Sequence, residues 1–171
     1  MTPTIAYQLN RLLRGSTPFV LTLLLALLSV VPTGISGFAV VTPAFVSISV
    51  FYWSIHRPYL MSAPLVFLIG IFSDFLTGAP LGLTSLMLLV VHGIALSQRR
   101  VFVGKAFLLT WWGYLLVAFG ISVISWLVTC LYSLTLIPLT PIMTQFLLTL
   151  LVFPLCAWGF GFLQNSLLRH T

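Results

Sequence analysis

The chain has 171 residues, of which 60% are hydrophobic and only 5% are charged, and its mean hydropathy is +1.20. A soluble domain carries about 25% charged residues, so this composition excludes a soluble fold of this size. The apolar runs, for example "LVFLIGIF", are continuous and lack the alternation of a transmembrane β-strand. The sequence therefore predicts an all-α polytopic membrane protein.

Six transmembrane helices are predicted, because apolar runs alternate with short segments that contain Pro, Gly or charge. A span needs about 20 residues, and the third and fourth runs are short by this measure. The connections are too short to hold a soluble domain, so residues 1–171 are expected to form one transmembrane domain. In chain order, the expected spans are 17–32, 38–56, 60–77, 81–98, 106–132 and 139–166.

The positions of the cations indicate the orientation. With six spans, all seven Lys and Arg residues fall on one side of the membrane, whereas five or seven spans would scatter them. The positive-inside rule makes that side cytoplasmic, with both termini inside. The seven are Arg11, Arg14, Arg57, Arg99, Arg100, Lys105 and Arg169.

Aromatic and small residues give two further expectations. Aromatic side chains near the span ends predict interfacial belts. Small residues on the fifth and sixth spans predict close helix packing, mainly within the protein. The expected inner belt is Tyr52, Trp53, Tyr59, Trp111, Trp112 and Trp158, and the outer belt is Trp126 and Tyr132. The small residues are Gly113, Ala118, Gly120, Ser122, Ser125, Ala157, Gly159 and Gly161.

Asp74 is the only acidic residue, and it lies one turn before the outer end of the third span. No cation is expected on that side, so its partners must be neutral. Gly78, Pro80 and Gly82 favour a tight turn after it. We expect Asp74 to accept hydrogen bonds from N–H groups at the start of the fourth helix and to fix that turn. The alternative is that Asp74 binds a cation or a proton.

Most catalytic chemistry is disfavoured by the residues available. Zinc sites need clustered His, Cys, Asp or Glu, and the sequence has no such cluster and no nucleotide-binding fingerprint. Cys130 and Cys156 are expected at different depths, which disfavours a disulfide. "GISG" at 34–37, with Ser36 and the later His92, has the form found in rhomboid intramembrane serine proteases. That motif is weak, since Gly-Ser turns are common, and His92 is expected to face another helix instead.

One stretch carries a family resemblance. "GIFSDFLTGAPLG" at 70–82 has the form G-x-x-x-D-x-x-x-G-x-P-L-G. "FYWSIHRP" at 51–58 and "QRR" at 98–100 support it. On these features the chain resembles the MreD family of rod shape-determining proteins, at motif level over about 43–105. The motif residues are Gly70, Asp74, Gly78, Pro80, Leu81 and Gly82.

The resemblance implies a non-catalytic scaffold in the cytoplasmic membrane of a bacterium. It would bind the bitopic protein MreC and, indirectly, MreB, RodA and penicillin-binding protein 2, and so support lateral peptidoglycan synthesis and cell shape. It implies no cofactor and no nucleic-acid partner. The family's fold is thought to be similar to that of S-components of energy-coupling-factor transporters. This similarity leaves open an alternative function, a small-molecule-binding transporter subunit.

The cytoplasmic face offers a second set of candidate contact residues. Basic residues there are expected to meet anionic lipid headgroups or an acidic partner, or alternatively to set the orientation alone. The candidate contact residues of this face are Arg57, Pro58, Arg99, Arg100 and Lys105.

Overall fold

The structure is a computed structural model that describes residues 5–29, 44–102, 107–134 and 138–167, with side chains for 17–29, 44–100, 108–134 and 138–162. This part of the chain contains six α-helices and one short 3-10 helix. The number of α-helices agrees with the prediction. They are α1 (Ile5–Leu28), α2 (Phe45–His56), η1 (Pro58–Leu60), α3 (Ala63–Thr77), α4 (Leu83–Phe102), α5 (Phe107–Ser133) and α6 (Thr140–Leu167).

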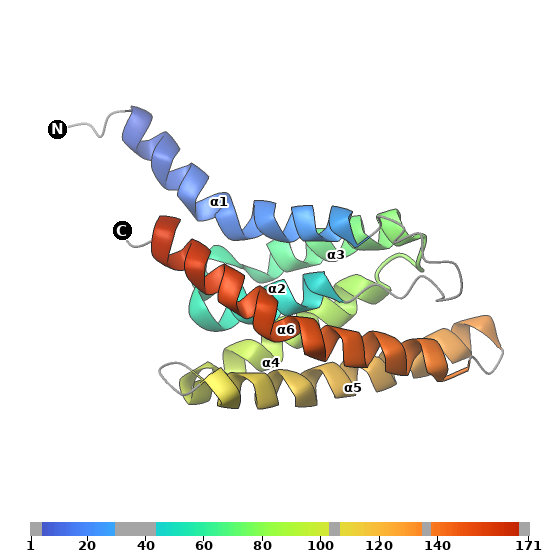
Figure 1. Cartoon of the computed structure of the whole chain (residues 1–171). Helices are drawn as coiled ribbons and strands as arrows, with labels where there is room; N and C mark the ends of the chain where they lie inside the picture. The colour runs from blue at the N-terminus through green and yellow to red at the C-terminus, as the bar shows by residue number, and fades with distance from the viewer. Residues whose placement is uncertain (1–4, 30–43, 103–106, 135–137, 168–171) are drawn as a thin grey trace.

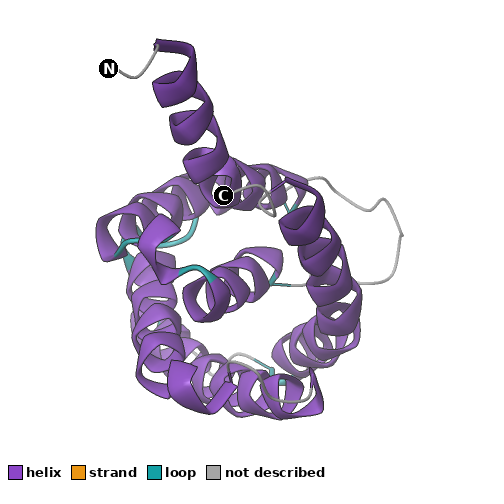
Figure 2. Cartoon of the chain, turned by 90° about the vertical axis from the view of Figure 1, so that its left-hand side faces the viewer, coloured by secondary structure: helices purple, strands orange, loops and turns teal. Residues whose placement is uncertain are grey.

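The helices form a ring around α2, which lies in the centre (Figure 2). Almost all of α2 is buried, including Val46 and every residue of 48–55. A helix that is apolar on all sides is stable only when it is surrounded, and α2 has this composition. The core of the molecule is therefore the interface between α2 and the helices around it.

Successive helices run in opposite directions, so the bundle has two distinct ends (Figure 1). The basic end carries Arg57, Arg99 and Arg100, and in Figure 1 it is on the left, where α1 begins and α6 ends. The turn end carries the 78–82 turn between α3 and α4. This alternation gathers the described Arg side chains at one end, as the positive-inside argument requires.

Helix boundaries agree with the sequence for the long apolar helices and differ for the first four. The helices α5 and α6 each lie within one residue of the expected span. The helix α3 begins at Ala63 instead of 60, and α4 runs from Leu83 to Phe102 instead of from 81 to 98. The helix α1 begins at Ile5 instead of 17. The expected start lies where the continuous apolar run begins, but the more polar residues before it are also helical. The helix α2 begins at Phe45 instead of 38, and residues 30–43 lie outside the described part of the chain.

Within the described part of the chain, two helical segments, Leu108–Ser133 and Thr140–Phe162, are long and apolar enough to cross a membrane. Three shorter apolar segments, Thr17–Leu28, Phe45–His56 and Ala63–Thr77, accompany them. With 12 residues, α2 is about 18 Å long at 1.5 Å per residue, against a hydrocarbon core of about 30 Å. Its central position explains how it can be so short, since protein rather than lipid surrounds it.

Two serine side chains of α2 are paired with polar side chains of the neighbouring helices. The hydroxyls of Ser49 and Thr22 are 2.7 Å apart, which joins α2 to α1. The Ser54 hydroxyl lies 2.7 Å from Nδ1 of His92, which joins α2 to α4. The prediction that His92 faces another helix is confirmed. Because a buried polar group without a partner is costly, these pairs fix how α2 is rotated in the ring.

The expected inner aromatic belt is wrong for Tyr52 and Trp53. They are only 6% and 0% exposed, because they belong to the central helix, and their rings meet edge to face at 5.6 Å. Phe160 of α6 packs against both. The other aromatic residues remain compatible with interfacial belts: Trp111 and Trp126 are partly buried, and Tyr59, Trp112, Tyr132 and Trp158 are exposed.

Close helix packing occurs at a different glycine from those expected. A Cβ on Gly70 of α3 would lie 2.3 Å from the Cα of Ser85, so α3 and α4 touch backbone to backbone there. A Cβ on Gly120 or Gly159 would meet no atom within 4 Å, so the expectation of close packing at these two is wrong. Ala118 and Ala157 are buried as expected. The tightest helix pair is thus α3–α4, the pair that carries Asp74.

Candidate functional site

The C-terminal end of α3 leads directly into the 78–82 turn. Gly78 ends the helix in the left-handed conformation, with φ 68° and ψ 18°, which glycine adopts without steric cost. The Thr77 hydroxyl donates to the carbonyl of Ser73 at 2.9 Å and so satisfies one of the last carbonyls of α3. Gly82, with φ 97°, then directs the chain into α4.

Asp74 supplies the N-terminal cap of α4 from the preceding helix. Its Oδ2 accepts a hydrogen bond from the N–H of Gly82 at 2.8 Å, and its Oδ1 accepts one from the N–H of Thr84 at 3.0 Å. A helix normally receives such bonds from the side chain of its own N-cap residue. Here the N-cap is Gly82, which has no side chain, so the carboxylate comes from α3. The expected hydrogen bonds of Asp74 are therefore confirmed.

The charge of Asp74 matches this position. The side chain is fully buried, and the nearest fixed positive potential is the N-terminal end of α4. Both carboxylate oxygens already accept hydrogen bonds from backbone N–H groups. These two hydrogen bonds are the ones that a structural role of Asp74 requires. His92 lies elsewhere, paired with Ser54 on α2.

The motif around Asp74 also presents apolar side chains to the exterior. Leu81, at the tip of the turn, is 74% exposed, and Phe75, next to Asp74 on α3, is 79% exposed. Asp74 is thus buried behind the turn, while Leu81 is exposed at its tip.

The candidate contact residues of the basic end are partly engaged within the fold. Nε of Arg99 donates to the carbonyl of Ile55 at 2.9 Å, at the C-terminal end of α2. Arg57 donates to the Tyr59 hydroxyl and lies over its ring. Pro58 begins η1, Arg100 is exposed, and Lys105 lies outside the described residues.

The described residues do not bring together the Ser and His side chains that a serine protease site needs. Ser36 lies outside the described residues, and His92 is buried against Ser54. Cys130 and Cys156 are both free cysteines, in agreement with the prediction. Within the described residues, no three His, Cys, Asp or Glu side chains lie close enough together to hold a metal ion.

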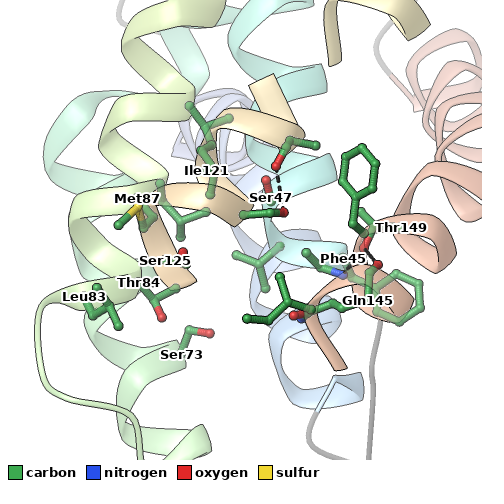
Figure 3. A pocket seen from close by; sticks show the side chains of 18 of the residues that line it. Phe45, Ser47, Ser73, Leu83, Thr84, Met87, Ile121, Ser125, Gln145 and Thr149 are labelled. Atoms are coloured by element: carbon green, nitrogen blue, oxygen red, sulfur yellow. Dashed lines mark hydrogen bonds between the residues drawn. The ribbon is translucent and has the colours of Figure 1, made fainter. Parts of the chain in front are cut away.

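A cavity of about 410 Å³ lies beside the 78–82 turn, and the sequence did not predict the residues that line it. It lies at the start of α2, between α3, α4, α5 and α6 (Figure 3). A weak signal was present in Ser122, Ser125 and Thr129, whose helical spacing places three hydroxyls on one face of α5. That face lines the cavity, so these small residues border an open space instead of packing closely against another helix.

The family follows from a comparison with known families. The family model described as rod shape-determining protein MreD matches residues 9–166, nearly the whole chain. The chain belongs to the MreD family. No curated protein and no solved structure matches it.

Membership in the MreD family identifies a rod shape-determining membrane protein. The all-helical bundle and its two long apolar helices agree with this class. The family match also extends the resemblance well beyond the Asp74 motif, since it includes α5 and α6.

Proposed function

We propose that this MreD-family protein is a non-catalytic scaffold of the bacterial cell-elongation complex. It crosses the cytoplasmic membrane with six helices, keeps both termini inside and binds MreC. Through MreC it supports MreB, RodA and penicillin-binding protein 2, and hence lateral peptidoglycan synthesis and cell shape. The family match is the observation that carries this proposal.

The surface of the bundle supports a scaffold that works within the membrane. Large apolar side chains are exposed along α5 and α6, and the described Arg side chains gather at the basic end. With this surface, partners must meet the protein in the bilayer or at its two faces. Helix association in lipid depends on packing and interhelical hydrogen bonds rather than on hydrophobic burial.

We further propose that the Asp74 turn contributes to assembly by presenting Leu81. The cap from Asp74 and the left-handed Gly78 hold the turn in one shape, and Leu81 is 74% exposed at its tip. A pre-shaped turn loses little conformational entropy when a partner binds. At the basic end, exposed Arg100 supports contacts with anionic lipid headgroups.

A pull-down from native membranes in mild detergent, followed by mass spectrometry, tests both proposals. The intact chain is expected to recover an MreC-like bitopic protein, and Leu81→Ser to recover several-fold less. Leu139→Ser is the matched control, since Leu139 is 53% exposed at the start of α6, at the same end of the bundle. Absence of MreC with the intact chain refutes the scaffold, and equal recovery by both variants refutes the role of Leu81.

The alternative function is a small-molecule-binding subunit similar to an S-component. The cavity beside the Asp74 turn is the observation that favours it. The same pull-down separates the two functions, because this alternative requires recovery of ATPase subunits in place of MreC.

A further inference from the structure

The cavity has the size of a small-molecule site. Its volume of about 410 Å³ falls within the range of about 300–1,000 Å³ that is usual for ligand pockets. Figure 3 shows Thr84 and Ser125 on one side of this space and Gln145 and Thr149 on the other. A single-chain molecule can enter a space of this volume, whereas a two-chain phospholipid is too large.

The length of the central helix explains why the space exists. The helix α2 has 12 residues and α5 has 27, so α5 is longer by about 22 Å at 1.5 Å per residue. Both Phe45 at the start of α2 and Thr129 near the end of α5 line the cavity. The ring of helices therefore continues toward the turn end past the start of α2, and the cavity occupies that part of its interior.

The lining predicts the charge of the occupant. Among the described residues that line the cavity there is no Asp, Glu, Lys, Arg or His. Asp74 is close by, but its two oxygens accept hydrogen bonds from Gly82 and Thr84. A charged group in this cavity would lose its hydration without gaining a counter-ion, which is costly in a low-dielectric interior. The favoured occupant is uncharged.

The lining also changes character along its depth. On α5 it runs from Tyr114 to Thr129, a distance of about 22 Å at 1.5 Å per residue. At the inner end the aliphatic side chains of Val46, Leu88, Val91 and Ala118 outnumber the two hydroxyl-bearing ones, Ser47 and Tyr114. Toward the turn end, hydroxyl and amide side chains dominate, among them Thr84 and Gln145. This gradient fits a molecule with one apolar end and one hydrogen-bonding end.

We propose that the cavity binds an uncharged single-chain amphiphile of the monoacylglycerol type. Its apolar chain lies toward Val91 and Ala118, and its hydroxyl headgroup meets Thr84, Ser125 and Gln145. The source is the membrane, because the outer faces of α5 and α6 that enclose the site are apolar. The site lies inside the bundle, and it adds a lipid-binding function to the proposed scaffold.

The test uses the full chain in nanodiscs of phosphatidylethanolamine and phosphatidylglycerol, which avoids sugar-headed detergents that resemble the proposed ligand. The probe is a 1-monoacylglycerol with a diazirine in its chain, and crosslinked residues are located by mass spectrometry. Crosslinks are expected at the inner end, on Met87, Val91 or Ala118, and unlabelled monoolein is expected to compete. Crosslinks confined to exposed positions such as Leu116 and Leu151 overturn the proposal.

Two pairs of variants sharpen the test. Ser122→Phe fills the cavity and is expected to reduce crosslinking at least fivefold. Gly120→Phe on the same helix is its control, since a side chain there grows into open space outside the lining. Thr84→Val keeps the shape of the lining and removes one hydroxyl, so about tenfold more monoolein should be needed to compete. Its control is Thr144→Val, which lies outside the lining and should change nothing.

Three results contradict the proposal even if crosslinks form in the cavity. Undiminished labelling in Ser122→Phe means that the probe binds elsewhere. Equal labelling by a diazirine-bearing lysophosphatidylglycerol means that the uncharged lining does not select the headgroup. Competition by free glycerol as strong as that by monoolein means that the inner end does not hold an apolar chain.

Discussion

Replacing Asp74 by Ala removes both hydrogen bonds that cap α4, to the N–H groups of Gly82 and Thr84 at 2.8 and 3.0 Å. Hydrogen bonds to a charged group contribute about 1.5–3 kcal/mol each, so the expected loss of unfolding free energy is about 3–6 kcal/mol. For a chain of this length, 1 kcal/mol corresponds to about 2–4 °C. We therefore expect the melting temperature of Asp74→Ala to fall by at least about 6 °C. Asp74→Asn keeps one acceptor and should lose about half as much.

The assay is thermal unfolding of the purified protein in one detergent, combined with hydrogen exchange of the peptide that contains residues 78–86. Exchange should quicken at the amides of Gly82 and Thr84 before it changes elsewhere, because these lose their acceptor directly. A melting temperature within about 1 °C of the unchanged protein, together with unchanged exchange at these amides, would refute the capping role of Asp74.

Two further predictions concern the helix contacts. Gly70→Ala should lower the melting temperature by several degrees, since its Cβ would lie 2.3 Å from the Cα of Ser85 and overpacking costs about 1–3 kcal/mol. Gly93→Ala, whose Cβ meets no atom within 4 Å, is the control, and an equal effect of both would contradict the close α3–α4 contact. A double-mutant cycle of Ser54→Ala and His92→Phe should give a coupling of about 0.5–1.5 kcal/mol, whereas additive effects would rule out the hydrogen bond between them.

The long apolar helices were predictable because their signal is local. Runs such as those of α5 and α6 lie within one residue of the expected spans, since continuous apolarity ends where polar or turn residues begin. The role of Asp74 was predictable for a related reason. A lone carboxylate beside a turn that contains Gly78, Pro80 and Gly82 has few available partners, and the nearest are the N–H groups of the next helix.

Other features depend on neighbours that are distant in sequence. The amphipathic start of α1 could not be recognised from hydropathy, because polar residues extend a helix without extending an apolar run. Tyr52 and Trp53 have the composition of an interfacial belt, and only the central position of α2 places them in the core. Gly120 and Gly70 look alike in sequence, yet only Gly70 faces a backbone, because α3 and α4 cross there.

The sequence by itself determined the membrane class, the number of α-helices, the ends of the long ones and the acceptors that Asp74 needs. These follow from composition and from contacts within about ten residues along the chain. Only the tertiary structure decided that α2 is the central helix, that α3 and α4 touch at Gly70, and that a neutral cavity lies at the start of α2. Each of these features depends on which face of each helix is buried. The burial of one face depends on how all the described helices pack together, so it cannot be read from one segment of the sequence.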